Sequence, residues 1–118
     1  MTLEILTSDS LGEIRHGFFT RHGGASSGVF SGLNCGSGSS DQREIVAINR
    51  ARVAEAMQVE PGHLLGVHQI HSATAIIADT PFQDKPRADA LVTATPGLAL
   101  SILTTDCQPL LFADTDAG

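Results

Sequence analysis

The chain has 118 residues, of which 42% are hydrophobic and 17% are charged, and its formal net charge is -6. This length fits one modest globular domain, and the composition is that of a folded chain rather than a disordered one. Seven basic residues against thirteen acidic ones exclude a general binder of nucleic acid or of anionic membranes. An anionic substrate would therefore need a local binding site.

The predicted location is the cytoplasm. Cys35 and Cys107 are far apart and form neither a disulfide framework nor a paired zinc-binding motif. The opening stretch, "MTLEILTSDS", lacks the basic and apolar regions of a secretory signal. No apolar run is long enough to cross a bilayer. We therefore expect neither a membrane nor a nucleic acid as a partner, and the oligomeric state stays open.

The first predicted elements are a strand and a long loop. The apolar run in "EIRHGFFTRHGG" indicates a strand that ends in a glycine-rich turn. The following stretch, "ASSGVFSGLNCGSGSS", has the composition of a surface loop. Three larger residues within it, Phe30, Leu33 and Cys35, are more than a plain linker would need.

One helix is predicted over residues 41–58. Asp41 and Glu44 have the spacing of a capping box at its start. The expected apolar stripe consists of Ile45, Ile48, Val53, Ala56 and Met57. Pro61 and Gly62 are expected to end the helix, because proline lacks an amide donor and glycine favours a turn.

The rest of the chain is predicted to be rich in strands, over residues 63–71, 73–79, 90–93 and 98–104. Residues 109–118 indicate another strand and a turn with no partner strand after it, which is typical of a fragment. A strand, a helix and then consecutive strands predict a mixed α/β or α+β fold in one domain, residues 1–118.

The residues with catalytic potential lie in the second half. In a strand over 63–71, His68 and His71 would point to opposite faces, so only one would enter a given site. Cys107 could be a small buried side chain, although the neighbouring Asp106 would then need a partner. A cysteine and a histidine suit either a zinc site with a third nitrogen ligand or a nucleophilic cysteine with a histidine base. The spacing leaves both interpretations open.

Six motifs occur in order along the chain, at Thr20, Arg21, Gly23 and Gly24; Ser31, Leu33, Asn34 and Gly36; Asn49 and Arg50; Gln69 and His71; Ala88, Asp89, Ala90, Val92 and Thr93; and Thr104, Asp106, Cys107 and Pro109. Together they resemble the YfiH-like family, also described as the multicopper polyphenol oxidase or laccase-domain family and as peptidoglycan editing factor. The resemblance covers about residues 14 to 113.

This resemblance implies a layered α/β/β/α sandwich with mixed sheets and a metal site, usually zinc, with His71 and Cys107 as ligands. The third family ligand is a histidine in a tryptophan-containing segment, which we expect beyond Gly118 because the chain has no Trp. His16, His22, His63 and His68 match no family ligand. Copper is less expected than zinc, because five scattered histidines cannot bind several copper ions.

The implied activity is phosphorolysis of purine nucleosides such as adenosine and inosine, with purine nucleoside and phosphate as the partners. Arg21 is the candidate for phosphate binding and Asn34 for the ribose or base, although each could instead be an ordinary surface or turn residue. Adenosine deamination is also implied, with metal-activated water as nucleophile and Asp89 or Asp106 moving protons. The candidate catalytic residues are thus Cys107, His71, Asp106 and Asp89.

The sequence departs from the family pattern in the loop before the helix, where Gly38 and Ser40 replace usual residues, and at Ser72, where glycine usually follows the histidine. Two alternatives remain open. Cys107 could be the nucleophile of a hydrolase or amidase that acts on cell-wall precursors. The chain could also be an inactive fragment that binds metal weakly or not at all.

Overall fold

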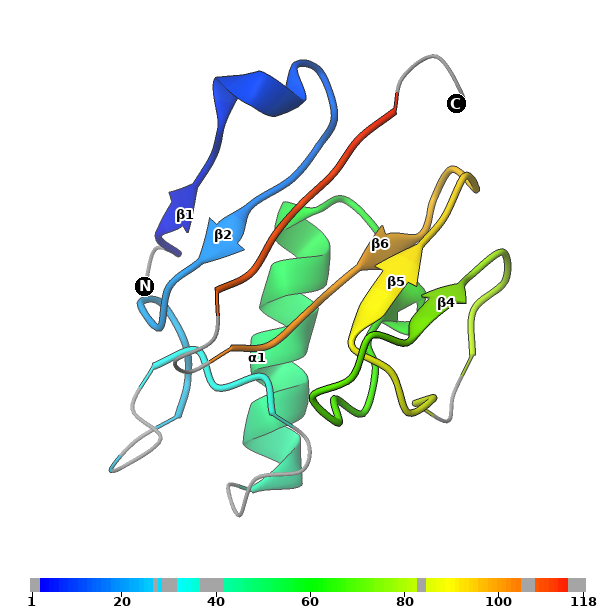
Figure 1. Ribbon diagram of the computed structural model, residues 1–118. Coiled ribbons are helices and arrows are strands. Elements are labelled where there is room, and N and C mark those ends of the chain that lie inside the picture. The colour runs from blue at the N-terminus through cyan, green and yellow to red at the C-terminus, as the bar shows by residue number, and fades with distance from the viewer. Residues whose placement is uncertain are drawn as a thin grey trace. The chain divides into compact units, whose positions relative to one another are not determined.

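The computed structural model describes residues 3–26, 28, 32–36, 42–82, 85–104 and 108–114. The chain divides into two compact units, an N-terminal unit, Met1–Met57, and a C-terminal unit, Gln58–Gly118. In the N-terminal unit, strands β1 (Ile5–Leu6) and β2 (Phe18–Phe19) pair antiparallel and precede helix α1 (Arg43–Ala56), as Figure 1 shows. A short 3-10 helix, Asp9–Leu11, lies between the two strands.

Helix α1 confirms the predicted helix but buries a different face. Its buried side chains are Val46, Asn49, Val53 and Ala54, at the i, i+3, i+7 and i+8 positions of one helical face. The predicted stripe included Ile48, which is 43% exposed. The buried face is therefore shifted by about one position, because the polar Asn49 occupies its centre.

Both ends of α1 differ from the prediction. The N-cap residue is Gln42, which makes no capping hydrogen bond with its side chain, and Asp41 lies outside the described residues. At the other end the helix stops at Ala56, and Gln58 has a left-handed backbone with φ of 60°. Pro61 begins a separate 3-10 helix, Pro61–His63, so it does not itself end α1.

The C-terminal unit contains two parallel strand pairs. Strand β3 (Leu64–Leu65) pairs with β6 (Ala99–Leu100), and β4 (Ala75–Ile77) pairs with β5 (Ala90–Val92). The buried apolar residues of this unit are Leu64, Leu65, Val67, Ala78, Ala88 and Ala99. One helix with parallel and antiparallel pairs among the described residues confirms the expected α/β class.

The predicted strand over residues 63–71 is wrong for most of its length. Only Leu64–Leu65 forms a strand, and His68 adds one isolated bridge to Arg87. His71 has a left-handed backbone with φ of 58°, which cannot continue a strand ladder. The prediction that His68 and His71 point to opposite faces of one strand is therefore also wrong.

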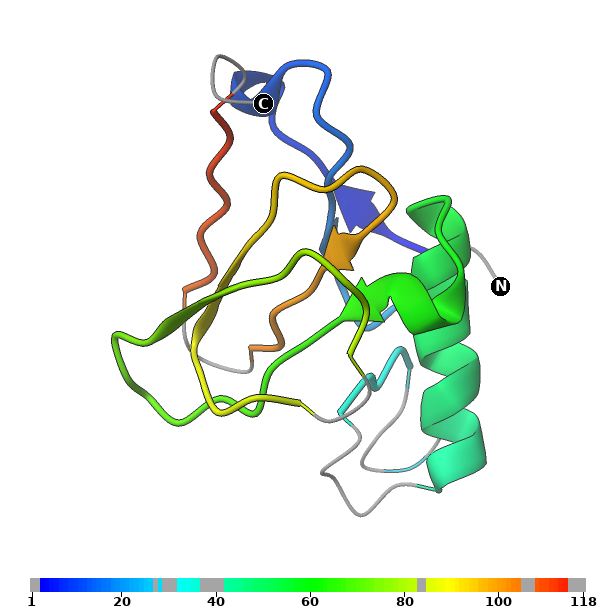
Figure 2. The ribbon, with the colours of Figure 1, turned by 90° about the vertical axis from the view of Figure 1, so that its right-hand side faces the viewer.

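The described part of the last predicted strand and turn, residues 109–114, forms no strand. Figure 2 shows this segment (red) running apart from β6 (orange) within the C-terminal unit. Most of its residues are exposed, with Leu110 at 66% and Phe112 at 87%. A β-strand requires hydrogen bonds to a neighbouring strand, and none of the described residues supplies them here.

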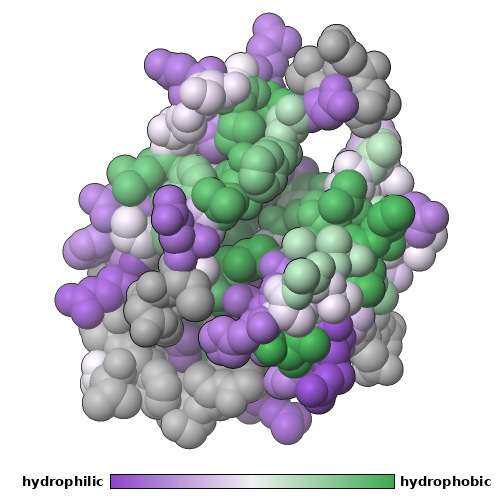
Figure 3. Space-filling view, viewed as in Figure 1, coloured by the Kyte–Doolittle hydropathy of each residue, from purple (hydrophilic) through white to green (hydrophobic). Residues whose placement is uncertain are grey.

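One face of the β4–β5 pair is apolar and open to solvent. Ile77 and Val92 are partners in the register of this pair, and they are 78% and 53% exposed. Figure 3 shows the apolar surface over these two strands.

Among the described residues, no helix has the length and apolarity needed to cross a membrane.

Candidate functional site

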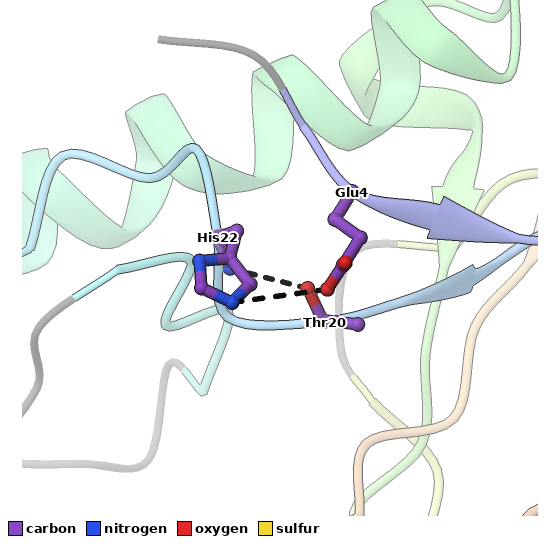
Figure 4. A network of polar contacts seen from close by, with 3 residues as sticks. All are labelled: Glu4, Thr20 and His22. Atoms are coloured by element: carbon purple, nitrogen blue, oxygen red, sulfur yellow. Dashed lines mark hydrogen bonds and ion pairs between the residues drawn. The ribbon is translucent and has the colours of Figure 1, made fainter.

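Arg21 lies directly after β2, on a turn whose backbone is hydrogen-bonded on both sides. The amide of Thr20 donates to the carbonyl of Glu4, and the carbonyl of Arg21 accepts from the amide of Leu33. Figure 4 shows that the amide of His22 reaches the Thr20 hydroxyl, while the His22 ring lies 3.8 Å from the Glu4 carboxylate. The Arg21 side chain is exposed. The backbone at Arg21 is thus constrained, while its side chain can reach an anion in solvent.

Two glycines let the backbone segments at Arg21 and Leu33 cross closely. A Cβ atom at Gly24 would overlap the carbonyl of Gly32, and a Cβ atom at Gly32 would overlap the carbonyl of Arg21. Gly32 also has φ of 107°, a conformation that favours glycine. The low bulk of this loop is therefore a steric requirement of the crossing.

Asn49 connects this loop to helix α1. Its side chain is fully buried and makes three hydrogen bonds, each 2.8 Å long. The carbonyl oxygen accepts from the amide of Ala25, and the side-chain nitrogen donates to the Ser26 hydroxyl and to the carbonyl of Asn34. One buried side chain therefore joins two parts of the loop that are eight residues or more apart in the sequence.

Two arginines of α1 support the same loop. Arg52 donates to the carbonyl of Gly23 at 2.7 Å, and Arg50 donates to the carbonyl of Cys35 at 3.3 Å. A partly buried carbonyl without a hydrogen-bond donor destabilises a fold, and the two guanidinium groups supply donors to these two carbonyls. The helix thus positions the loop from Gly23 to Cys35 through Asn49 and these two arginines.

The predicted substrate residue Asn34 has a structural role at this loop. Its side-chain oxygen accepts from the amide of Gly36 at 3.1 Å, which is the geometry of an Asx turn. Its main-chain carbonyl accepts from Asn49. Arg21 and Asn34 are brought near one another, because Leu33, next to Asn34, hydrogen-bonds to Arg21.

In the C-terminal unit, Asp89 and His71 meet at one turn. The Asp89 carboxylate accepts the amides of Ile70, His71 and Ser72 at distances of 2.7 to 3.2 Å. It also accepts the Ser72 hydroxyl at 2.7 Å. The His71 ring is exposed, and it makes no hydrogen bond or ion pair to any described residue.

These hydrogen bonds change the acidity of Asp89. Loss of hydration alone would raise the pKa of its carboxyl group. Donation from the Ser72 hydroxyl and from the amides of Ser72, Ile70 and His71 outweighs this effect and lowers the pKa from 3.8 to about 2. Asp89 is therefore ionised at neutral pH, with both oxygens accepting hydrogen bonds.

Gln69 connects the other side of the His71 segment to the chain that leads toward Cys107. Its side-chain oxygen accepts from the amide of Leu103 at 3.0 Å. The amide and hydroxyl of Ser101 both donate to the carbonyl of Leu65, each at 2.8 Å. Residues 101–103 therefore run beside residues 65–69, while Asp106 and Cys107 themselves lie outside the described residues.

A complete metal site is not formed by the described residues. No group of three His, Cys, Asp or Glu side chains within the described ranges could hold a metal ion. His71 is the one member of the expected ligand set that these ranges contain. The described residues therefore do not by themselves fit a bound zinc or copper ion.

His16 has a structural role. Its Nδ1 donates to the carbonyl of Ile14 at 2.8 Å, because a carbonyl can only accept, and its Nε2 accepts from the amide of Ser8 at 2.8 Å. Both ring nitrogens of His16 are thus used within the N-terminal unit.

The sequence did not predict the hydrogen-bonding roles of three residues, Asn49, Gln69 and Ser72. The motif that contains Asn49 does not indicate its role, although a polar residue at a buried helix position is a signal of a hydrogen-bonded role. The motif that contains Gln69 likewise does not indicate its hydrogen bond to Leu103. Ser72 departs from the family pattern, but only the structure relates it to Asp89.

Residues 15–118 match the protein family described as multi-copper polyphenol oxidoreductase laccase. The chain belongs to this family. The resemblance predicted from the six motifs is therefore confirmed, and the family description names a metal, copper.

Several bacterial relatives are named purine nucleoside phosphorylase. The chain is 38% identical over 112 residues to the protein from Streptomyces coelicolor, covering 93% of this chain and 46% of the relative. It is 45% identical over 106 residues to one from Deinococcus radiodurans, covering 89% of this chain and 40% of the relative. It is 36% identical over 121 residues to one from Streptomyces griseus, covering 100% of this chain and 49% of the relative. The chain thus spans less than half the length of these relatives.

Proposed function

We propose that this chain contributes to a purine nucleoside phosphorylase, an enzyme that transfers a ribosyl group from a purine to phosphate. The observation that carries this proposal is the identity of 36 to 45% to three proteins with that name. Two arrangements in the structure are compatible with it. They are the exposed Arg21 on its constrained loop and the exposed His71 on the turn hydrogen-bonded to Asp89.

The reaction makes few covalent demands on the protein. A phosphate oxygen bonds to the anomeric carbon of the ribose as the glycosidic C–N bond breaks. The purine leaves with the electron pair and takes up a proton, and ribose 1-phosphate is formed. Catalysis of this kind depends on positioning and on stabilisation of charge.

Arg21 is the proposed phosphate contact. Its guanidinium group is exposed and makes no ion pair or hydrogen bond to any described residue. A guanidinium group binds phosphate through two parallel hydrogen bonds, which also orients the anion. The hydrogen bonds from Leu33 and Thr20 reduce the backbone freedom that would otherwise be lost on binding.

Asn34 is the proposed contact to ribose or base, with a restriction that follows from its turn. Its side-chain oxygen already accepts from Gly36, so a second role for that oxygen would use its other lone pair. The main-chain hydrogen bond from Asn49 sets the position of Asn34 relative to the loop.

We include zinc in the proposal, with His71 and Cys107 as two ligands and a third ligand outside this chain. The support is the exposed His71 ring and the path of residues 101–103 beside residues 65–69. Metal analysis of purified protein would test this directly. One zinc per chain that falls in both His71→Ala and Cys107→Ala would support it, and unchanged content in either variant would overturn it.

Adenosine deamination is the secondary activity of the proposal. It needs water as a nucleophile and an acid that moves protons. Asp106 is the better candidate of the two aspartates, because both oxygens of Asp89 accept hydrogen bonds from the turn at His71.

The test is incubation of the purified chain with inosine or adenosine, with and without phosphate, and separation of the products by chromatography. A parallel sample joins this chain to the unmatched remainder of the Streptomyces coelicolor relative. Release of hypoxanthine or adenine that requires phosphate and is lost in Cys107→Ala supports the proposal. Release without phosphate supports a hydrolase, and conversion of adenosine to inosine supports the deaminase.

The remaining alternatives make different predictions in the same assay. A cysteine nucleophile would be trapped by an alkylating substrate analogue, and Cys107→Ser would abolish the labelling. No turnover by either sample, with zinc well below one per chain, would contradict the phosphorylase proposal and favour an inactive fragment.

A further inference from the structure

The turn at His71 is built around an internal anion. Three successive amides, those of Ile70, His71 and Ser72, all donate to the carboxylate of Asp89. Successive amides that converge in this way form a nest, an arrangement that binds anions. Here the anion is a side chain of the same unit, 17 to 19 residues farther along the chain.

The conformation of His71 depends on such support. Its φ of 58° lies in the left-handed region, which is unfavourable for a residue with a Cβ atom. Conformations of this kind persist only where the surrounding structure determines them. The hydrogen bonds to a charged acceptor are of the stronger class, and they act on the amide of His71 and on both neighbouring amides.

Ser72 connects this turn to the strand pair. Its hydroxyl donates to Asp89 at 2.7 Å and accepts from the amide of Thr74 at 3.2 Å. The amide of Asp89 in turn donates to the carbonyl of Thr74 at 3.1 Å. Asp89 precedes β5 and Thr74 precedes β4, so the turn is hydrogen-bonded to the start of a paired element.

We propose that Asp89 is the positioning residue for His71. Its carboxylate keeps the backbone of His71 left-handed and thereby sets the direction in which the imidazole leaves the turn. In this role Asp89 moves no proton during the reaction and acts only through His71. The kinetic part of this inference depends on the proposed function, whereas the conformational part does not.

The conformational test is nuclear magnetic resonance of the chain with Asp89→Asn, Ser72→Ala or Asp79→Asn. An asparagine side chain has one acceptor oxygen and a donor nitrogen, so it cannot accept hydrogen bonds from all four donors. We expect the couplings and carbon shifts of His71 to leave the left-handed range in Asp89→Asn and to change less in Ser72→Ala. Asp79→Asn removes an exposed carboxylate of the same unit and should leave His71 unchanged. A left-handed His71 in Asp89→Asn would overturn the proposal.

The kinetic test uses the sample that turns over inosine. Asp89→Asn should lower kcat at least about tenfold, because a small misplacement of a functional side chain is costly in rate. The double variant Asp89→Asn/His71→Ala should be no slower than His71→Ala, because both changes act on one group. The remaining activity of Asp89→Asn should keep the wild-type pH profile. Additive losses, or loss of one limb of that profile, would overturn the proposal in favour of direct proton transfer.

The two tests also separate this inference from the proposed function. If no sample turns over inosine but His71 changes conformation in Asp89→Asn, the phosphorylase proposal fails while the positioning role stands. If Asp89→Asn unfolds the unit, Ser72→Ala removes the two hydroxyl contacts, to Asp89 and to Thr74, and keeps the three amide contacts. A smaller shift of His71 in that variant is then the expected result, and no shift is the contrary one.

Discussion

The side chain of Asn49 donates a hydrogen bond to the main-chain carbonyl of Asn34, 2.8 Å away, from the centre of the buried face of α1. The same side chain accepts from the amide of Ala25. The loop that carries Arg21 is therefore positioned by a polar group within the helix face, and not by apolar packing alone.

Asn49→Ala should destabilise the N-terminal unit by about 2 to 4 kcal/mol, because partly buried groups at Ala25 and Asn34 lose their partners. Urea denaturation measures the loss, and the exchange rate of the Ala25 amide localises it. Ile48→Ala is the control on the same helix, where the 43% exposed side chain predicts a change below about 1 kcal/mol. Equal effects of the two substitutions would contradict the role of Asn49.

Gly24→Ala should destabilise the loop by about 1 to 3 kcal/mol, because the new Cβ atom would overlap the backbone of Gly32. Gly62→Ala is the control, since a Cβ atom there meets open space and should change stability by about 0.5 kcal/mol or less. Thermal unfolding of both variants measures the difference. Wild-type stability of Gly24→Ala would mean that the two segments do not cross closely.

Arg21→Ala should raise the KM for phosphate about tenfold or more in the nucleoside assay, because a charge-assisted pair of hydrogen bonds is lost. The KM of Arg21→Lys should lie between the values of wild type and Arg21→Ala, since lysine keeps the charge without the planar guanidinium group. Arg15→Ala removes another exposed arginine of the same unit and should leave the KM unchanged. Equal KM values for Arg21→Ala and wild type would exclude Arg21 as the phosphate contact.

The free energy of unfolding should depend on pH through Asp89. Its pKa is about 2 in the folded chain and 3.8 as the ordinary value, so its hydrogen bonds stabilise the fold fully above about pH 4. This stabilisation is lost as the pH falls through about 2. The difference in unfolding free energy between wild type and Asp89→Asn should thus be constant from pH 7 to about 4 and shrink below that. A difference that stays constant down to pH 2 would contradict the contacts at Asp89.

Gln69→Ala should accelerate exchange of the Leu103 amide, because the acceptor of its hydrogen bond is removed. Hydrogen exchange read residue by residue makes this measurement. Gln108→Ala, at an exposed glutamine of the same unit, should leave that rate unchanged. An unchanged Leu103 rate in Gln69→Ala would show that the Gln69 side chain does not hold the segment before Asp106.

Patterns of apolar and polar residues predict those helices and strands whose formation depends on neighbouring residues in the sequence. Helical periodicity predicts α1, and short apolar runs bounded by turn residues predict strands at β4, β5 and β6. The buried face of α1 could not be predicted, because apolar periodicity gives no weight to a polar residue such as Asn49. Its burial depends on partners 15 to 24 residues away.

The turn at His71 was missed for a similar reason. The run of apolar residues before it indicated a strand, while its left-handed backbone depends on Asp89, 18 residues later. The family resemblance selected His71, Asp89 and Arg21 as site residues, and it gave no information on the contacts among them. The roles of Asp106 and Cys107 stay predictions, since both lie outside the described residues.

The most direct test of the phosphorylase proposal is phosphorus nuclear magnetic resonance of the chain, alone and joined to the remainder of the relative, with inosine and inorganic phosphate. The proposal predicts a ribose 1-phosphate signal that grows in equal amount to the hypoxanthine released, and it predicts no hypoxanthine when phosphate is omitted. Hypoxanthine without ribose 1-phosphate, or neither product from either sample, would contradict it.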